Sequence, residues 1–320
     1  MSSFLITGGC GFIGSWLARR LVSEGHEVVL YDVNTESRLV DDLRDKTRIL
    51  RGSITDYETL RQAVRESRPD VIIHYAALLS SAAEREPRRG YEVNIASTWP
   101  LFEIARESDV DAVLFASSTA AYGPTKAQNY SEDLYAPPAT IYGISKIVGE
   151  LIGLWFYRTY GIQFAAFRYG SVIGPGRKDG GASSYTTLII QKPAQGESYT
   201  ASVDEETRMP IVYVKDAVDA TLFVYGKIGT LGDERIFNVT SLTPSPTAGM
   251  MAQAVKKYIP EAQIGFNPLD DIMRIVKSWP RDIDVTRLLS LGWKPRYTDL
   301  NSLVEDFINE VKQKPQIFRI

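Results

Sequence analysis

A run of four glycines within seven residues near the N-terminus constrains the fold more than any other feature. The run follows the apolar residues 4–6 and precedes a stretch with helical spacing, so it lies in a turn between a strand and a helix. Glycines in such a turn let the backbone approach a pyrophosphate, and the helix N-terminus supplies N–H groups. A tight turn that binds nothing is the alternative. The expected phosphate-binding residues are Gly8, Gly11, Phe12, Ile13 and Gly14.

Short apolar runs alternate with amphipathic stretches along the first half of the chain. The runs are too short for buried helices and lack polar alternation, which is typical of strands covered on both faces. They comprise residues 4–6, 28–30, 71–73, 112–115 and 164–167. Helices are predicted between them, in particular over residues 57–64, 91–106 and 141–160. This order predicts an α/β fold with a doubly wound parallel sheet, the Rossmann architecture.

The pattern changes after about residue 170, where glycines and prolines punctuate a loop-rich stretch. We expect residues 1–170 to form a nucleotide-binding core and residues 171–320 to form mainly a smaller α/β substrate-binding lobe. Two later apolar runs, near residues 211–214 and 237–239, are predicted to be strands that return to the core. A helix is predicted near residues 248–258.

Composition excludes several classes of chemistry. The single cysteine, Cys10, excludes an intramolecular disulfide and multi-cysteine metal sites, and two histidines exclude a three-histidine zinc site. We expect no metal. The net charge of −3, with acidic and basic residues intermixed, predicts no nucleic-acid partner. No targeting segment or long apolar run is apparent, so the expectation is a cytoplasmic protein that does not bind membranes.

Asp32 ends the second predicted strand, eighteen residues after Gly14. A carboxylate at this place accepts hydrogen bonds from both hydroxyls of the adenosine ribose and repels the 2′-phosphate of NADP. A solvated turn aspartate is the alternative. The sequence therefore predicts NAD as cofactor, with Ser53 and Ile54, which follow the third strand, at the edge of the adenine.

Tyr142 and Lys146 are four residues apart in a predicted helix, so the phenol and the ammonium share one face. A tyrosine that acts as a base near pH 7 needs a pKa well below its free value of about 10. The ammonium and the positive charge of an oxidised nicotinamide are the expected sources of this change. Ser118, at the end of the strand that begins near residue 112, is expected to hold the substrate oxygen.

Together, the glycine run, Asp32, Ser118 and the Tyr142/Lys146 pair resemble the extended short-chain dehydrogenases/reductases over nearly the whole chain. The resemblance implies Ser118, Tyr142 and Lys146 as catalytic residues, and Tyr142 and Lys146 as cofactor contacts. It also implies Asn94 as a structural residue of the active site. Ala76, Ala77 and Asn94 complete the expected cofactor-binding set. Members of the family commonly form homodimers through two helices, here near residues 91–106 and 141–160.

Several segments are most similar to the short-chain-type L-threonine 3-dehydrogenases. They are residues 74–80 (HYAALLS), 140–146 (TIYGISK), 208–213 (RMPIVY), 237–240 (FNVT) and 278–280 (SWP). The similarity implies that Ser80 contacts the substrate, as does Ser183 or Ser184, where the family has two threonines. Residues 174–177 (GPGR) are instead closer to nucleotide-sugar epimerases. Arg208 suits a carboxylate or a phosphate, although a structural ion pair is equally compatible with its position.

These features predict an NAD-dependent oxidation of a secondary alcohol in a small polar substrate. The favoured substrate is L-threonine, which yields 2-amino-3-ketobutyrate, with Ser118 and Tyr142 both contacting it. The alternative is a nucleotide-sugar 4-epimerase or dehydratase that uses the same residues and keeps its NAD tightly bound.

Overall fold

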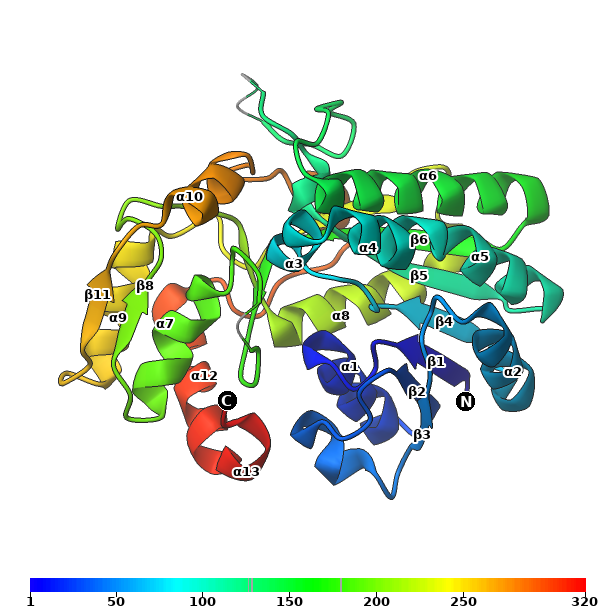
Figure 1. The fold of residues 1–320 in the computed structure, drawn as a ribbon, viewed down its shortest axis with the longest axis horizontal. Coiled ribbons are helices and arrows are strands. Elements are labelled where there is room, and N and C mark those ends of the chain that lie inside the picture. Colours follow the sequence, from blue (N-terminus) through cyan, green and yellow to red (C-terminus); the bar gives the residue numbers. More distant parts are fainter. Residues whose placement is uncertain (126, 128, 179) are drawn as a thin grey trace.

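A parallel sheet forms the centre of the molecule in the computed structural model, which describes residues 1–125, 127, 129–178 and 180–320 (Figure 1). Within the described residues the sheet has seven strands in the order β10-β6-β5-β4-β1-β2-β3. They are β1 (Ser3–Thr7), β2 (Glu27–Asp32), β3 (Arg48–Arg51), β4 (Val71–His74), β5 (Ala112–Ser118), β6 (Gln163–Tyr169) and β10 (Ile236–Val239). Strand order reverses between β1 and β4, which creates a crevice at the carboxyl ends of these strands.

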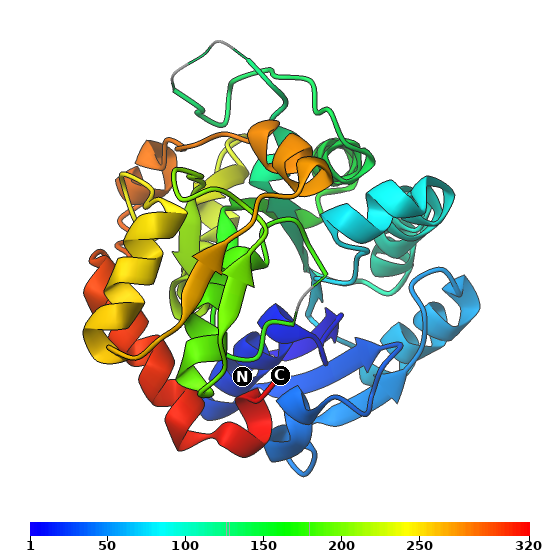
Figure 2. The ribbon, with the colours of Figure 1, turned by 60° about the vertical axis from the view of Figure 1, so that its left-hand side comes forward.

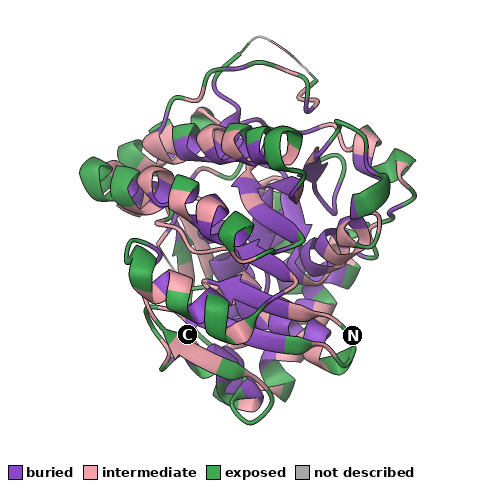
Figure 3. Cartoon of the chain, turned by 90° about the vertical axis from the view of Figure 1, so that its right-hand side faces the viewer, coloured by how far each residue is buried: buried purple, intermediate pink, exposed green. Residues whose placement is uncertain are grey.

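Both faces of this sheet are covered, which explains the uninterrupted apolar runs. Phe4 and Ile6 of β1 pack into one hydrophobic cluster with residues of α1 (Phe12–Ser23) and α8 (Val214–Tyr225), whereas Leu5 packs into another with residues of α2 (Tyr57–Ser67), α5 (Thr98–Glu107) and α6 (Ile141–Tyr160). Alternate residues of a strand face opposite sides of a sheet, so a strand covered twice must be apolar throughout. Figure 3 shows the buried strands between helices whose outer faces are exposed. The prediction of a doubly wound α/β fold is confirmed.

Helices and short helical turns connect the strands of the first half. They are α1 (Phe12–Ser23), η1 (Arg38–Leu43), α2 (Tyr57–Ser67), α3 (Ser80–Arg85), α4 (Pro87–Tyr91), η2 (Glu92–Ala96), α5 (Thr98–Glu107), η3 (Thr119–Ala121) and α6 (Ile141–Tyr160). The continuous helix predicted over residues 91–106 is divided, with a π-helical turn at η2. Pro100 explains the interruption, because it has no N–H to donate to the carbonyl four residues earlier.

Helix α6 lies unusually close to the sheet. The side chain of Thr140 caps its N-terminus by accepting a hydrogen bond from the Gly143 N–H at 3.0 Å. A Cβ atom on Gly149 would stand 2.2 Å from the ring of Phe115, and one on Gly153 would stand 2.2 Å from the ring of Phe164. Glycine at these two positions therefore lets the helix pack against β5 and β6. This close packing fixes the start of α6 above the carboxyl end of β5.

Most of the C-terminal elements gather on one side of the molecule, whereas the helix Val214–Tyr225 (α8) packs against α1 and the large sheet (Figures 1 and 2). Two pairs of short strands lie outside the large sheet: β7 (Ser171–Ile173) with β9 (Ile211–Tyr213), and β8 (Tyr199–Ala201) with β11 (Ile264–Phe266). The helices are α7 (Tyr185–Ala194), α8 (Val214–Tyr225), η4 (Ile228–Thr230), α9 (Ala248–Tyr258), α10 (Asp270–Lys277), α11 (Thr286–Ser290), α12 (Leu300–Gln313) and α13 (Pro315–Phe318). In the described part of the chain, none of the helices is both long and apolar enough to cross a membrane.

The two strands expected to return to the core differ in their placement. Strand β10 pairs with β6 and forms an edge of the large sheet. Strand β9 pairs with β7 in a separate sheet, so the expectation that it returns to the large sheet was wrong. The chain changes partners at Gly170, whose N–H bonds to the carbonyl of Val239, whereas the next N–H bonds to the carbonyl of Pro210. Strand β9 thus extends the structure beyond the carboxyl edge of the sheet.

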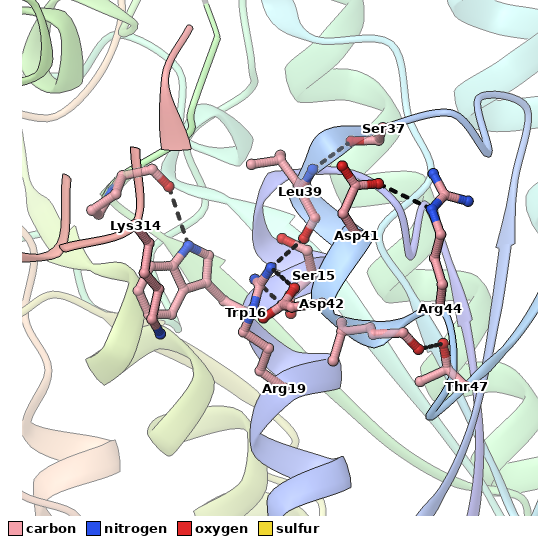
Figure 4. Close-up of polar contacts among 12 residues, drawn as sticks. Ser15, Trp16, Arg19, Ser37, Leu39, Asp41, Asp42, Arg44, Thr47 and Lys314 are labelled. Carbon is pink, nitrogen blue, oxygen red and sulfur yellow. Dashed lines mark hydrogen bonds and ion pairs between the residues drawn. The ribbon is translucent and has the colours of Figure 1, made fainter. Parts of the chain in front are cut away.

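Helix α13 folds back onto α1 and joins the C-terminal lobe to the core. The ring of Phe318 stacks on Trp16 with centroids 5.1 Å apart and an interplanar angle of 5°. The carbonyl of Phe318 accepts a hydrogen bond from the amide of Gln191 at 2.9 Å. Figure 4 shows Trp16 and Arg19 beside η1, where Arg19 forms an ion pair with Asp42 at 2.6 Å.

Substitution of Phe318 by alanine is expected to lower the free energy of unfolding by about 3 kcal/mol, because a fully buried aromatic side chain leaves a cavity. Urea unfolding followed by circular dichroism measures this change. Gln316→Ala in the same helix is the matched control, since that side chain is exposed. Equal stability of the two variants would show that α13 contributes little to the joint between the lobes.

Candidate active site

A cavity of about 550 Å³ lies at the carboxyl end of the sheet, between the core and the C-terminal elements. Its position agrees with the rule that open α/β sheets bind ligands at the point where strand order reverses. Most residues predicted from the sequence line it together. These are Gly8, Gly11, Phe12, Ile13, Gly14, Asp32, Ser53, Ile54, Ala76, Ala77, Ser80, Ser118, Tyr142, Lys146 and Ser183.

The glycine loop forms one wall of this cavity. Gly8 has a φ of +69°, and a Cβ atom there would stand 2.7 Å from the backbone nitrogen of Ala76. A Cβ atom on Gly14 would stand 2.5 Å from the carbonyl oxygen of Gly8. No side chain caps the N-terminus of α1, where Gly11 is the N-cap residue. The loop therefore presents backbone N–H groups to the cavity, as a pyrophosphate requires.

Asp32 lies at the end of β2, on the same wall. Its carboxylate accepts hydrogen bonds from the backbone N–H groups of Cys10 at 3.1 Å and Asn34 at 3.0 Å. Burial raises the pKa of Asp32, and these hydrogen bonds partly oppose that effect. Ser53 follows β3, and its carbonyl accepts a hydrogen bond from the hydroxyl of Tyr31 at 3.0 Å. This end of the cavity therefore has a carboxylate at the place where Rossmann folds bind the adenosine ribose.

Ser118, Tyr142 and Lys146 meet at the other end, where β5 and α6 come together. The Ser118 hydroxyl lies close enough to the Tyr142 phenol to lower its pKa, and it accepts a hydrogen bond from the Ala120 N–H at 3.1 Å. The ammonium of Lys146 donates to the carbonyl of Ala116 at 2.7 Å and lies 5.1 Å from the centre of the Tyr142 ring. The i, i+4 spacing on α6 thus places the phenol and the ammonium on one face, as the sequence predicts.

The electrostatics of Tyr142 differ from the sequence-based expectation. Burial raises the pKa of Tyr142, while the Ser118 hydrogen bond and the positive charge of Arg177 lower it. Burial also lowers the pKa of Lys146 to about 8, against the opposing charge of Glu150. A less fully charged lysine stabilises a phenolate less strongly. The protein groups around Tyr142 therefore do not bring its pKa below the ordinary value. A further positive charge would be needed for the phenol to act as a base near neutral pH.

A buried ion pair between Glu150 and Arg168 lies one turn of α6 beyond Lys146. It was not predicted from the sequence. Glu150 accepts two hydrogen bonds from Arg168, at 2.8 and 2.7 Å, and one from the hydroxyl of Ser117. Both charged side chains are almost completely buried. The signal that points to it is spacing, because Glu150 lies four residues after Lys146 on the same face of α6.

The end of the cavity at Tyr142 is lined by groups from both parts of the chain. Ser80 begins α3, and its hydroxyl accepts a hydrogen bond from the Ala182 N–H at 3.4 Å. Ser183 accepts from Arg177 at 2.7 Å. Arg177, which ends the epimerase-like segment of residues 174–177, lines the cavity near Tyr142. Trp279 and Met209 line the same region.

Three predicted site residues are not among the described lining residues. Asn94 instead holds the loop that carries Leu78, since its side chain bonds both the N–H and the carbonyl of that residue at 2.8 and 2.9 Å. Ser184 donates to the carbonyl of Gly181 at 2.7 Å. Arg208 forms an ion pair with Asp282 at 3.7 Å, so the structural alternative describes its position in this structure.

Neither His74 nor Cys10 is charged at neutral pH in this structure. His74 is buried and lies 2.7 Å from the Thr7 hydroxyl, and burial together with the charge of Lys146 lowers its pKa to about 3. Burial raises the pKa of the Cys10 thiol to about 12, so it stays protonated at neutral pH. Both observations agree with structural roles for these two side chains.

Comparison with known proteins shows to which family this chain belongs. Residues 4–240 match the model of the NAD dependent epimerase/dehydratase family. The chain belongs to this family. It is an NAD-dependent enzyme of the extended short-chain dehydrogenase/reductase type, and the glycine cradle and the carboxylate of Asp32 fit that cofactor.

Individual members of the family show where the chain lies within it. The mitochondrial L-threonine 3-dehydrogenase of Sus scrofa is 32% identical over 311 residues, which cover 95% of this chain and 81% of the relative. The GalE-like L-threonine dehydrogenase of Cupriavidus necator, in its holo form, is 27% identical with a TM-score of 0.87, over 97% of this chain and 99% of that one. The UDP-glucose 4-epimerase of Thermotoga maritima is 25% identical with a TM-score of 0.84, over 98% and 99%.

Replacement of Asp32 by alanine is expected to weaken NAD binding about tenfold to a hundredfold, because hydrogen bonds to a charged acceptor are worth about 1.5–3 kcal/mol. Calorimetric titration of NAD and NADP into the wild type and the variant measures the effect. Asp41→Ala, at an exposed aspartate of η1, is the control. Tighter binding of NADP than NAD by the wild type would contradict the role assigned to Asp32.

Proposed function

We propose that this enzyme oxidises the secondary alcohol of a small 3-hydroxy amino acid, with L-threonine as substrate and 2-amino-3-ketobutyrate as product. The observation that carries the proposal is the meeting of Ser118, Tyr142 and Lys146 at one end of the cavity, opposite Ser80 and Ser183. Similarity to L-threonine dehydrogenases over almost the full chain supports the choice of substrate. The assignment of residues 171–320 mainly to the substrate side stays a prediction.

In this proposal, the Tyr142 phenolate accepts the proton of the substrate hydroxyl, and Ser118 donates a hydrogen bond to the same oxygen. Lys146 would hold the nicotinamide ribose. Bound NAD⁺ would supply the acceptor for the hydride of the carbinol carbon and a positive charge beside Tyr142. The alcohol thus loses one proton and one hydride and becomes a ketone. Asn94 acts through the loop at Leu78, which lines the cavity.

The alternative function is epimerisation or dehydration of a nucleotide sugar with retained NAD. Two observations favour it: the likeness to a UDP-glucose 4-epimerase, and the cations Arg177 and Lys178 on the cavity wall. Against it, Ser171 stands where such enzymes usually carry an asparagine after the strand that ends at Tyr169.

A single assay separates the two functions. The purified enzyme is incubated with NAD and either L-threonine or a UDP-hexose, and the absorbance of reduced cofactor is followed while the sugar is analysed by chromatography. NADH formed in proportion to consumed L-threonine supports the proposal. Interconversion of the UDP-hexose without net NADH would establish the alternative instead.

We also propose that the enzyme forms a homodimer through α5 and α6. Trp99 and Trp155 are partly exposed on these helices with ring centroids 5.1 Å apart, and Leu151, 61% exposed, lies one turn before Trp155. Such an apolar patch on two adjacent helices is typical of an interface.

Light scattering after size-exclusion chromatography is expected to give the mass of two chains for the wild type and of one chain for Leu151→Arg, because a charge in an apolar interface costs several kcal/mol. Lys256→Ala, at an exposed position of α9 and on neither interface helix, is the control. A monomeric wild type at micromolar concentration would contradict the dimer.

A further inference from the structure

The loop of residues 174–177 contacts the core at the end of the cavity formed by the glycine loop and β2, here called the cofactor end. A Cβ atom on Gly174 would stand 3.0 Å from the ring of Phe12, and one on Gly176 would stand 2.5 Å from a methyl group of Leu39. Phe12, Leu39 and Gly176 all line the cavity. Phe12 begins α1 and Leu39 lies in η1. The loop therefore contacts both segments that border the cofactor end.

Gln191 of α7 joins this loop to the C-terminal helix α13. Its side-chain oxygen accepts a hydrogen bond from the Gly176 N–H at 3.1 Å, and its side-chain nitrogen donates to the carbonyl of Phe318 at 2.9 Å. The Gln191 side chain is fully buried, so water does not compete for these two bonds. One side chain thus connects two segments that lie far apart in the sequence.

Phe318 of α13 packs between the loop and η1. An atom of its ring lies 3.2 Å from the point where a Cβ atom on Gly176 would stand, and the ring shares a hydrophobic cluster with Leu39. A second bond joins the same segments, since Nη2 of Arg38 donates to the carbonyl of Arg319 at 2.8 Å. Helix α13 therefore holds η1 directly and the loop through its hydrogen-bonded carbonyl.

Helix α1 supports both sides of this contact. The indole N–H of Trp16 donates to the carbonyl of Pro175 in the loop at 3.2 Å, and the Trp16 ring stacks on Phe318. Arg19, one turn later, donates to the carbonyl of Leu39 (Figure 4). Each of these interactions joins one protein group to another. The same interactions therefore oppose both the entry and the release of a molecule at the cofactor end.

We propose that Gln191 and Phe318 are positioning residues for the cofactor: they hold residues 174–177 against Leu39, and this loop contact must open before NAD or NADH exchanges. The inference goes beyond the proposed oxidation, because it concerns the cofactor and applies equally to an epimerisation. Opening of such a contact commonly limits turnover in enzymes that release a cofactor or product in each cycle.

Stopped-flow fluorescence of NADH tests the inference without any alcohol substrate. Association is followed over a range of NADH concentrations, and release is followed after excess NAD displaces bound NADH. Wild type, Gln191→Leu and Phe318→Leu are compared. Phe102→Leu is the matched control, because Phe102 is a fully buried phenylalanine of α5 that packs in the cluster on the opposite face of the sheet. Urea unfolding measures the stability of each variant.

The wild-type association rate is expected to level off at high NADH concentration, because opening of the loop contact then limits binding. Gln191→Leu and Phe318→Leu should raise this plateau and the release rate together by about tenfold, the effect of one to two lost hydrogen bonds or of comparable packing. The Kd for NADH should change little, since entry and release become faster alike. A residue that only contacts the cofactor would change the release rate and leave the plateau unaltered.

Four results would overturn the inference. A wild-type association rate that stays proportional to NADH concentration would show that no opening step limits exchange. An unchanged plateau in both variants, or a faster release without a higher plateau, would show that Gln191 and Phe318 do not control the loop contact. An equal increase in Phe102→Leu would trace the effect to a general loss of stability. The wild-type measurement decides the matter even where a variant fails to fold, and the assay with L-threonine tests the proposed oxidation separately.

Discussion

Tyr142→Phe is expected to reduce kcat for substrate oxidation by about a thousandfold or more, because removal of a positioned general base costs about 10²- to 10⁴-fold. Phenylalanine keeps the ring against which the Lys146 ammonium lies, 5.1 Å from the centroid, so the fold and the NAD affinity should change little. The remaining activity should also lose its rise toward alkaline pH. Burial raises the pKa of Tyr142, so the wild-type phenolate becomes more abundant as the pH increases.

Steady-state NADH formation across a range of pH, together with NAD titration, measures these effects. Tyr160→Phe is the matched control, since this tyrosine lies at the exposed end of the same helix. Full activity of Tyr142→Phe would show that another group accepts the proton. A loss of NAD affinity as large as the loss of kcat would instead indicate a role in cofactor binding alone.

Glu150→Ala is expected to lower the free energy of unfolding by about 3–5 kcal/mol, because it leaves the buried charge of Arg168 without its partner. Urea unfolding provides the measurement, and Glu305→Ala, at an exposed position of α12, provides the control. The double variant Glu150→Leu/Arg168→Met should recover much of the lost stability, since apolar side chains of similar size can replace a buried pair. A double variant no more stable than Glu150→Ala would show that the pair also organises groups such as Ser117 around it.

Glu150→Ala should also change the pKa of Lys146 in the proposed catalytic group. The charge of Glu150 raises the pKa of Lys146, which burial lowers to about 8. Without that carboxylate the lysine pKa falls further, so less of the lysine is charged near neutral pH. We therefore expect kcat/KM to rise less with increasing pH in Glu150→Ala than in the wild type, because the lysine loses its charge at a lower pH.

Much of the fold could be predicted because its signals are local. Apolar runs such as residues 71–73 mark strands covered on both faces, and Thr140 before α6 marks a helix start. The division of the helix at η2 was missed because an isolated proline within a helical pattern has several outcomes. The place of β9 was missed because the pairing of a short strand depends on partners far along the chain, here β7.

In the site, too, the residues in local patterns could be predicted, whereas those placed by long-range packing could not. The glycine loop, Asp32 and the Tyr142/Lys146 pair are short-range patterns whose spacing specifies a backbone shape or a shared helix face, and the sequence alone therefore determined that these residues line one cavity. Arg168, Arg177 and Arg208 are chemically identical in the sequence. Only the tertiary structure places one behind α6, one on the cavity wall and one against Asp282, because long-range packing decides which charges are buried, paired or turned toward a ligand.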